Sequence, residues 1–462
     1  MRGLLRTSVL SLALVVVGPG AGATVSSDLQ LDGNPGASPA AVACATALSC
    51  VVVGTTSAKA VAVHWTPGTL RPISILGQVG RGANELSGVA CHGGTCVAVG
   101  RVSTASAWTT PRVDVLRGGT VSTRTLPSAV PGPNGLDAVD CVSASTCTAV
   151  GDQSGGTAAI NQAAITTLTF SANGALTATT PAHPTPGRLS SLSAVSCPTL
   201  GTCVAVGATF DGSTWTPLVE QQSGATWTVV PTSSLGTGYL VSVSCATSGS
   251  CVAVGSTTGL ASPVARPIIL AETSGIWGST SLSLPGTALT SVSCWMPGQC
   301  RAVGVVGAAA ARRPTSIVLG GNGWSIDHGV GLPAGMRSAQ LSAVSCWNPG
   351  LCRMVGTATS ATGVTNGIAE VTTAPVVLHL SPSTGSVHGG TIVTVTGVNL
   401  SRPSVVSFGT TRASKVVAVS PTELKVTAPA RPAGAVSVTV RTAGGTSAAT
   451  VASTFTYLSS AK

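Results

Sequence analysis

Fourteen cysteines are the residues of this sequence whose type and spacing point most clearly to chemistry. They form seven pairs: Cys44/Cys50, Cys91/Cys96, Cys141/Cys147, Cys197/Cys203, Cys245/Cys251, Cys294/Cys300 and Cys346/Cys352. Zinc sites typically combine two-residue cysteine spacings with further ligands nearby, whereas here four or five residues separate the thiols and only His92 lies inside a pair. Paired thiols in an exported protein form disulfide bonds, so we predict seven disulfides, no metal site and no cofactor.

The cysteine pairs also mark a repeat. First cysteines follow one another at intervals of 47 to 56 residues, and each second cysteine leads into an apolar segment closed by glycine, as in Cys251-Val-Ala-Val-Gly255. Each repeat divides into strand-length segments, in the fifth repeat Leu240 to Cys245, Cys251 to Gly255, Pro267 to Glu272 and Trp277 to Leu284. The second segments lack polar alternation, which is typical of strands buried on both faces. Such repeats indicate a β-propeller of seven blades over residues 24–374.

Within each repeat the cysteines are expected to join the first two strands of a hairpin. In the fifth repeat Cys245 and Cys251 would oppose one another, with Val243 and Ala253 on the same face. A closed loop of this size contributes roughly 2 kcal/mol per disulfide in the chain-entropy model. We therefore assign the disulfides a structural role.

The two ends of the repeat array indicate how the ring closes. The seventh repeat reaches Pro375 without a fourth strand, whereas the strand-like segment Val25 to Leu31 precedes the first cysteine pair without a partner of its own. We predict that this segment is the outermost strand of the last blade. Closure through both ends removes an exposed sheet edge.

The first 23 residues have the features of a secretion signal. Arg2 and Arg6 give a positive start, and Val9 to Val17 is an apolar run too short to span a bilayer. Ala21-Gly22-Ala23 is a small-residue cleavage site. The sequence therefore predicts a signal peptide over residues 1–23. The mature protein is expected to have no membrane span and to lie outside the cell, secreted or associated with the cell wall.

Composition narrows the possible partners. Only 8% of residues are charged and 3% aromatic, but 44% are hydrophobic and arranged in strand-length runs, which is enough to build a core. The net charge of +10 comes from scattered basic residues with no aromatic platform between them. Nucleic-acid binding requires a clustered basic surface, so we expect no nucleic-acid partner.

From Pro375 onward the pattern changes, with no cysteine and a new series of strands. The characteristic segments are Ser381-Pro-Ser-Thr-Gly385, His388-Gly-Gly390, Val393-Thr-Val-Thr-Gly-Val-Asn-Leu400, Val406-Ser-Phe-Gly409, Glu423-Leu-Lys-Val-Thr-Ala-Pro429, Val436-Ser-Val-Thr-Val440 and Phe455-Thr-Tyr457. They resemble an IPT/TIG domain, an immunoglobulin-like sandwich, over residues 375–458. The resemblance implies a binding or spacer module found outside bacterial cells, without catalytic residues.

Within this domain Gly389-Gly390 are expected in a tight turn, and the alternating valines of the segments from Val393 and Val436 in the sandwich core. The complete chain is thus predicted to be all-β, a seven-bladed β-propeller followed by an immunoglobulin-like β-sandwich. The whole arrangement resembles disulfide-stapled repeat proteins secreted by bacteria.

Residues with the chemistry of an active site are few. A sialidase-type site needs an arginine cluster, paired acids and a tyrosine nucleophile, and the only tyrosines are Tyr239 and Tyr457. Tyr239 precedes a first strand, where it either points towards the central channel or packs at the end of a blade. Glu220 and Glu272 occupy equivalent positions one blade apart, too distant for a glycosidase pair, and we interpret them as solvated edge charges. The six histidines are expected on the surface or in turns.

Two tryptophans lie inside predicted disulfide loops of adjacent blades. Trp295 follows Cys294, and Trp347 follows Cys346, so both rings would stand on the same rim of the propeller. Two aromatic faces one blade apart could contact a sugar chain. The alternative is that each ring packs on its own disulfide and shields it. Together with Tyr239, these tryptophans are the candidate ligand contacts.

The sequence favours a secreted, non-enzymatic binding protein whose partner is a cell-envelope glycan or an extracellular protein. The alternative is an exported hydrolase or lyase with an active site at the propeller's central channel. That alternative requires ionisable side chains converging on the channel, and few stand at the ends of the first strands. We therefore assign no catalytic residue.

Overall fold

The structure is a computed structural model. It describes residues 25–459 except for 30–36, 47–48, 57–58, 67–68, 74–81, 104–108, 128–133, 155–160, 172–173, 185–188, 233–235, 258–264, 281, 309–310, 321–322, 328–329, 334, 349–350, 372–374, 401–404, 421, 443–444, 448 and 450. The predicted signal peptide lies outside the described residues. Strands form almost all of the regular structure, and no helix within the described part has the length and apolar character needed to cross a membrane.

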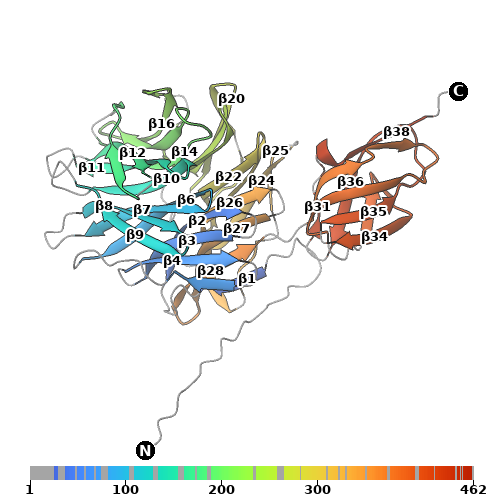
Figure 1. The fold of residues 1–462 in the computed structure, drawn as a ribbon, viewed down its shortest axis with the longest axis horizontal. Helices are drawn as coiled ribbons and strands as arrows, with labels where there is room; N and C mark the ends of the chain where they lie inside the picture. Colours follow the sequence, from blue (N-terminus) through green and yellow to red (C-terminus); the bar gives the residue numbers. More distant parts are fainter. Residues whose placement is uncertain are drawn as a thin grey trace, which may run out of the picture.

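Seven four-stranded antiparallel sheets, blades 1 to 7, precede the C-terminal domain in the described chain (Figure 1). Blade 1 contains β2 (Ser38–Thr46), β3 (Ser49–Thr56), β4 (Lys59–Thr66) and β5 (Thr69–Pro72); blade 2 contains β6 (Asn84–His92), β7 (Thr95–Ser103), β8 (Thr109–Arg117) and β9 (Thr120–Thr125). Blade 3 contains β10 (Gly135–Ser143), β11 (Thr146–Ser154), β12 (Asn161–Phe170) and β13 (Leu176–Thr179); blade 4 contains β14 (Leu189–Ser196), β15 (Val204–Phe210), β16 (Trp215–Ser223) and β17 (Thr226–Val229).

The remaining blades follow the same order. Blade 5 contains β18 (Tyr239–Thr247), β19 (Ser250–Ser256), β20 (Pro267–Thr273) and β21 (Ile276–Ser279); blade 6 contains β22 (Thr287–Met296), β23 (Gln299–Val306), β24 (Arg313–Gly320) and β25 (Gly323–Ile326). Blade 7 contains β26 (Met336–Asn348), β27 (Leu351–Ser360), β28 (Thr365–Val371) and β1 (Val25–Leu29). The fourth strand of blade 5 is shorter than the expected Trp277 to Leu284, because Leu282 and Leu284 leave the sheet and pack between blades 5 and 6.

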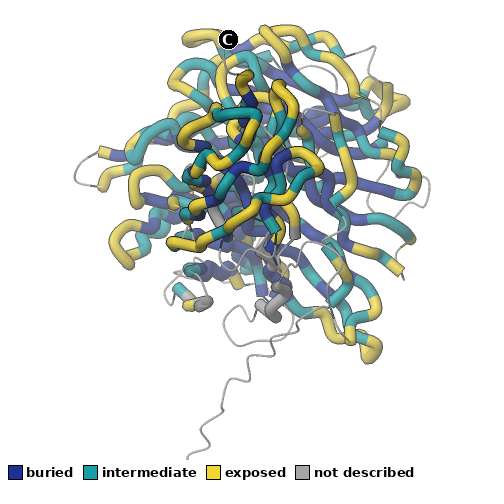
Figure 2. The backbone as a smooth tube through the Cα atoms, turned by 90° about the vertical axis from the view of Figure 1, so that its right-hand side faces the viewer, coloured by how far each residue is buried: buried dark blue, intermediate teal, exposed yellow. Residues whose placement is uncertain are grey.

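Seven hydrophobic clusters join the blades into a closed ring. Each cluster contains residues of two neighbouring blades, and the last pair is blade 7 with blade 1, where Ala343 and Val355 pack with Val52 and Trp65. Figure 2 shows that buried residues lie mainly inside the molecule and exposed residues mainly at its outer turns. A sheet covered on both faces needs apolar side chains on both, which explains the unbroken apolar second strands. The predicted propeller is confirmed.

Strand β1 closes the ring as expected. It pairs antiparallel with β28, with Val25 opposite Val371 and Leu29 opposite Gly367. The sheet order of blade 7 is β1-β28-β27-β26, so the N-terminal segment is its outermost strand (Figure 1). The first and last parts of the propeller sequence therefore share one hydrogen-bonded sheet, which leaves no gap in the ring.

The glycine that ends each second strand is required by close backbone packing. In every first strand the register shifts at a β-bulge near its start, as between Leu240 and Ser242 in blade 5. There the carbonyl of Tyr239 lies against Gly255, where a methyl group would overlap the oxygen and would approach the Cα of Leu240 to 2.9 Å. The equivalent glycines are Gly54, Gly100, Gly151, Gly207, Gly304 and Gly356.

The serine of the repeated Ser-Cys dipeptide links one blade to the next. The backbone N–H of Cys294 donates to Ser244 Oγ of the preceding blade at 2.9 Å, and that of Cys346 donates to Ser293 Oγ at 3.0 Å. Equivalent bonds join blade 4 to blade 5 through a serine and blade 3 to blade 4 through Asp140. Because equivalent positions are bonded, the first strands of these blades run in the same direction.

This common direction gives the ring two different rims. The disulfide rim carries the hairpins between first and second strands, where the register pairs Cys245 with Cys251. The connector rim is the opposite one and carries the starts of first strands and the ends of second strands, such as Tyr239 and Ser256.

All seven expected cysteine pairs are bonded in the structure, with Cα atoms 3.9 to 4.0 Å apart. Each bond closes the hairpin between the first and second strands of its blade, as predicted. The bonds are Cys44–Cys50, Cys91–Cys96, Cys141–Cys147, Cys197–Cys203, Cys245–Cys251, Cys294–Cys300 and Cys346–Cys352.

The second cysteine of each disulfide is also a core residue. We predicted that each disulfide closes one hairpin, and its second cysteine has a further role in the packing between blades. Each second cysteine lies in one of the seven clusters between blades, because the second strands are covered on both faces. The buried second cysteines are Cys50, Cys96, Cys147, Cys203, Cys251, Cys300 and Cys352. Their side chains therefore belong to the packing between blades and not to an accessible site.

The C-terminal domain is a sandwich of two sheets. One sheet contains β29 (Val376–Ser381), β31 (Ile392–Val398), β35 (Glu423–Thr427) and β34 (Lys415–Ser420). The other contains β30 (Thr384–Ser386), β38 (Thr454–Leu458), β36 (Gly434–Thr442), β32 (Val405–Phe408), β33 (Thr411–Arg412) and β37 (Gly445–Thr446), with the short 3-10 helix η4 (Val451–Ser453) before β38. The expected valines of β31 and β36 line the core with Phe408, Phe455 and Tyr457, and Gly389-Gly390 form the expected turn with φ of 75° and 82°.

Candidate functional site

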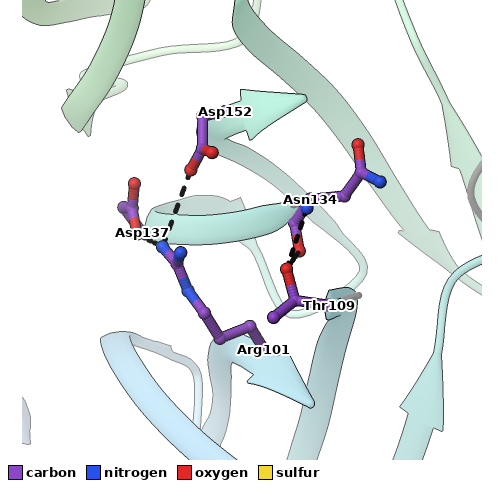
Figure 3. Close-up of polar contacts among 5 residues, drawn as sticks. All are labelled: Arg101, Thr109, Asn134, Asp137 and Asp152. Carbon is purple, nitrogen blue, oxygen red and sulfur yellow. Dashed lines mark hydrogen bonds and ion pairs between the residues drawn. The ribbon is translucent and has the colours of Figure 1, made fainter. Parts of the chain in front are cut away.

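A cluster of ionisable side chains lies on the connector rim between blades 2 and 3 (Figure 3). The Arg101 guanidinium, at the end of β7, donates to the Asp137 carboxylate at the bulge of β10 and lies 3.6 Å from the Asp152 carboxylate at the end of β11. Beside it Thr109 and Asn134 exchange hydrogen bonds of 2.8 and 2.9 Å. Both carboxylates thus contact one guanidinium nitrogen, which fixes blade 2 against blade 3.

The surroundings favour the protonated form of these acids. Burial, followed by the negative charge of Asp137, raises the pKa of Asp152 to about 6, although Arg101 opposes the shift. Burial also raises the pKa of Asp137 against the effect of Arg101. The cluster therefore contains one carboxyl group, that of Asp152, that titrates close to neutral pH. The side chain of Asp152 is only 10% exposed.

This raised pKa predicts a pH dependence of stability. Asp152 holds its proton more tightly in the folded protein than in the unfolded chain, where its pKa is about 3.9. Between the unfolded pKa of Asp152 and its folded pKa of about 6, the folded state thus binds more protons than the unfolded chain. The free energy of unfolding should therefore fall by roughly 2 kcal/mol as pH rises from 4 to 7. Urea unfolding at pH 4, 5, 6 and 7 measures this slope. Asp152→Asn should reduce it, and an equal slope in variant and wild type would contradict the assignment.

A second feature of the connector rim is a row of three aromatic rings between blades 4 and 5. Phe210 ends β15, Trp215 begins β16 and Tyr239 begins β18. The ring centroids of Phe210 and Trp215 are 5.2 Å apart, and those of Trp215 and Tyr239 are 5.5 Å apart. All three residues are partly exposed. We call these residues the aromatic row.

Local backbone structure holds the aromatic row in place. Phe210 and Trp215 are the terminal register pair of β15 and β16, so their rings stand side by side. The turn between them is fixed by Asp211, whose carboxylate accepts hydrogen bonds from the backbone amides and hydroxyls of Ser213 and Thr214. These bonds, led by the amide of Thr214, lower the pKa of Asp211 to about 2. The turn therefore keeps its anchor throughout the physiological pH range.

The three predicted ligand-contact residues have different surroundings. Tyr239 stands at the end of a blade and packs on Trp215 of the neighbouring blade. Trp295 is partly buried against the cluster between blades 6 and 7, and its Nε1–H donates to Gln299 Oε1 at 2.9 Å. Trp347 is 52% exposed. On the disulfide rim, only one of the two tryptophans thus offers a largely exposed ring.

The interpretation of Glu220 and Glu272 as solvated edge charges was wrong. Both are buried, because third strands are flanked by fourth strands and their side chains point between blades. Glu220 lies 3.3 Å from Nδ1 of His183, whose side chain is only 4% exposed, so this histidine is not on the surface either. Glu272 accepts a hydrogen bond of 2.8 Å from Gln221 across the interface between blades 4 and 5.

The cluster around Arg101 was not predicted from the sequence. A signal was present, because Asp137 occupies the bulge position where Val241 and Thr290 stand in other blades. Likewise Arg101 and Asp152 directly follow the closing glycines of consecutive repeats. Asp137 and Asp152 share the hairpin of β10 and β11, and the packing of blade 2 against blade 3 brings Arg101 to them. No group of three or more potential metal ligands occurs among the residues that the structure describes.

Comparison with protein families identifies the second domain. The family model of the IPT/TIG domain matches residues 375–457. This part of the chain is an IPT/TIG domain. The strand order and core described above agree with the immunoglobulin-like sandwich that the resemblance implied. No curated protein matches the chain.

Several solved structures are similar to this chain at low identity. The structure described as YCF48 bound to D1 peptide is 13% identical, with a TM-score of 0.49 over 78% of this chain and 97% of that one. The GH74 xyloglucanase from Xanthomonas campestris is 11% identical, with a TM-score of 0.46 over 81% and 59%. The β-propeller domain of the trilobed protease from Pyrococcus furiosus is 8% identical, with a TM-score of 0.43 over 72% and 95%. Fold does not imply function, and no activity is carried over from them.

Proposed function

We propose that the protein is a secreted binding protein that recognises a component of the cell envelope, a glycan or a surface protein, through the connector rim of its propeller. The observation that carries this proposal is the partly exposed aromatic row formed by Phe210, Trp215 and Tyr239. Aromatic residues are only 3% of the sequence, yet three of them gather here outside any buried cluster. Tyrosine and tryptophan are enriched where proteins bind partners.

Two further features support a role outside the cell. The seven disulfides fit an oxidising compartment, since cytosolic thiols are kept reduced. The predicted signal peptide over residues 1–23 would direct the protein to secretion, and the IPT/TIG domain is a second module of a kind found in extracellular proteins. In this proposal the propeller binds the partner and the C-terminal domain binds or acts as a spacer.

The proposal is tested by sedimentation with isolated bacterial cell walls. The mature protein, residues 24–462, should be retained on the walls in a saturable way. Trp215→Ala should reduce the retained fraction at least about fivefold at subsaturating protein, because a central aromatic contact typically carries more than 1 kcal/mol. The matched control is Leu200→Ala, which trims an exposed apolar side chain in the disulfide loop of blade 4 on the opposite rim and should be retained like wild type. Absence of saturable retention, or equal retention of the Trp215 variant, would contradict the proposal.

A second candidate, an exported hydrolase or lyase, is favoured by the cluster around Arg101. Asp137 and Asp152 form a carboxyl pair, and a group with a pKa of about 6 can exchange protons near neutral pH. This candidate predicts turnover in a panel of polysaccharide and ester substrates. Asp152→Asn should abolish that turnover, whereas Leu200→Ala should leave it unchanged.

A further inference from the structure

The chemistry of the aromatic row and its surroundings narrows the class of partner. We propose that Phe210, Trp215 and Tyr239 bind the sugar rings of a neutral polysaccharide chain that crosses from blade 4 to blade 5. This inference rests on the binding role proposed above and names its ligand. It is carried by the shape of the row, its charge and its rigidity.

The shape of the row suits a chain of sugar rings. Its three rings come from three strands of two neighbouring blades and follow one another at contact distance, with tilts of 40° and 35° between successive planes. A pyranose has an apolar face of C–H groups and a polar rim of hydroxyls, so it packs flat on an aromatic ring while its rim remains hydrogen-bonded. A row of three rings offers such contacts to successive sugar units.

The charge around the row fits an uncharged ligand. The described residues 209–216 and 236–240, which carry the row, include no cationic side chain, and Arg266 is the basic residue that the register of blade 5 brings to the same rim beside Ser256 and Thr257. A nucleic acid or an acidic polymer requires a cluster of basic side chains, which these residues do not form. The one carboxylate, Asp211, already accepts four hydrogen bonds from its own turn.

The row is also rigid before it meets a ligand. The N–H of Gly238 donates to the carbonyl of Trp215 at 2.9 Å, which ties the backbone before Tyr239 to the neighbouring blade. Gly238 has a φ of 138°, and a Cβ atom there would lie 2.5 Å from the carbonyl oxygen of Ser256 and 2.8 Å from the Cα of Thr257, so this link depends on glycine. A preformed surface loses little conformational entropy on binding, which suits stacking contacts that are individually weak.

The test is isothermal titration calorimetry of the mature protein with cellohexaose, xylohexaose, mannohexaose and chitohexaose. At least one hexasaccharide should bind saturably. Trp215→Ala should weaken that binding about tenfold or more, whereas Trp215→Phe, which keeps a ring, should weaken it less. Leu200→Ala, which trims an exposed side chain on the disulfide rim, should bind like wild type. Urea unfolding of each variant verifies that a loss of binding is not a loss of folding.

The outcomes separate this inference from the proposed function. If no hexasaccharide binds, and protease treatment of the cell walls abolishes their retention of the protein, the partner is a surface protein. The inference is then overturned and the proposed function stands. Binding of a hexasaccharide that the Trp215→Ala variant retains in full overturns the placement on the aromatic row. If neither untreated walls nor any hexasaccharide retains the protein, both proposals fail.

Discussion

Deletion of residues 24–32 is expected to lower the melting temperature by about 5 °C or more. The deletion removes β1, whose five residues pair with β28, and it exposes the edge of blade 7. Each ladder hydrogen bond contributes roughly 1 kcal/mol, so the loss amounts to several kcal/mol. It also leaves unpaired N–H and C=O groups that promote aggregation. Differential scanning calorimetry measures the shift.

Two controls make this result specific to strand pairing. A synthetic peptide of residues 24–32, added in excess to the truncated protein, should restore much of the lost melting temperature because it can take the place of β1. The double variant Ser26→Pro/Ser27→Pro, in the middle of the ladder, should destabilise the full chain in the same direction, because the N–H groups of neighbouring residues in an edge strand point to opposite sides, so one of these two faces β28, and proline cannot donate. An unchanged melting curve for both the deletion and the proline variant would contradict closure through β1.

Gly255→Ala is expected to reduce the free energy of unfolding by about 3 kcal/mol or more. The added methyl group would overlap the carbonyl oxygen of Tyr239 and crowd Leu240, both of which are backbone obstacles that no rotamer change can remove. The first strand must then move away from the second at the point where it bulges. Urea unfolding gives the loss directly.

Gly278→Ala is the matched control for this substitution. Gly278 lies in β21 of the same blade, and a Cβ atom there meets nothing within 4 Å. Its replacement should change stability by only a few tenths of a kcal/mol to about 1 kcal/mol, and in the stabilising direction if its backbone conformation suits alanine. Equal losses of unfolding free energy in the two variants would contradict the prediction, because the close backbone contact at Gly255 would then not be what requires glycine.

These two predictions concern features that the sequence indicated and the structure explained. The cysteine spacing and the unbroken apolar segments predicted the propeller, because a strand covered on both faces needs no polar alternation. The orphan segment before the first cysteine pair predicted the closure by β1. The repeated glycine was visible, but its reason was not, because it depends on how closely one strand approaches the next at a bulge.

The candidate sites depended far more on the tertiary structure. Arg101 and Asp152 are separated by one whole repeat in the chain, and only the ring brings the end of one blade against the next. Likewise Tyr239 lies against Trp215 because neighbouring blades meet at the connector rim, whereas Phe210 pairs with Trp215 within one hairpin. The burial of Glu220 and of the second cysteines depends on the same packing. Contacts between blades join residues distant in sequence, and no local pattern encodes them.

The sequence by itself thus determined the kind of protein: an all-β chain of seven disulfide-paired repeats with an IPT/TIG domain behind them. These properties follow from local spacing, because disulfide hairpins, strand periodicity and domain motifs each depend on residues within a few dozen positions of one another. The tertiary structure decided which side chains share a rim, which acids are buried and which rings lie together. Those properties arise where blades pack against one another, and so they exist only once the ring has closed.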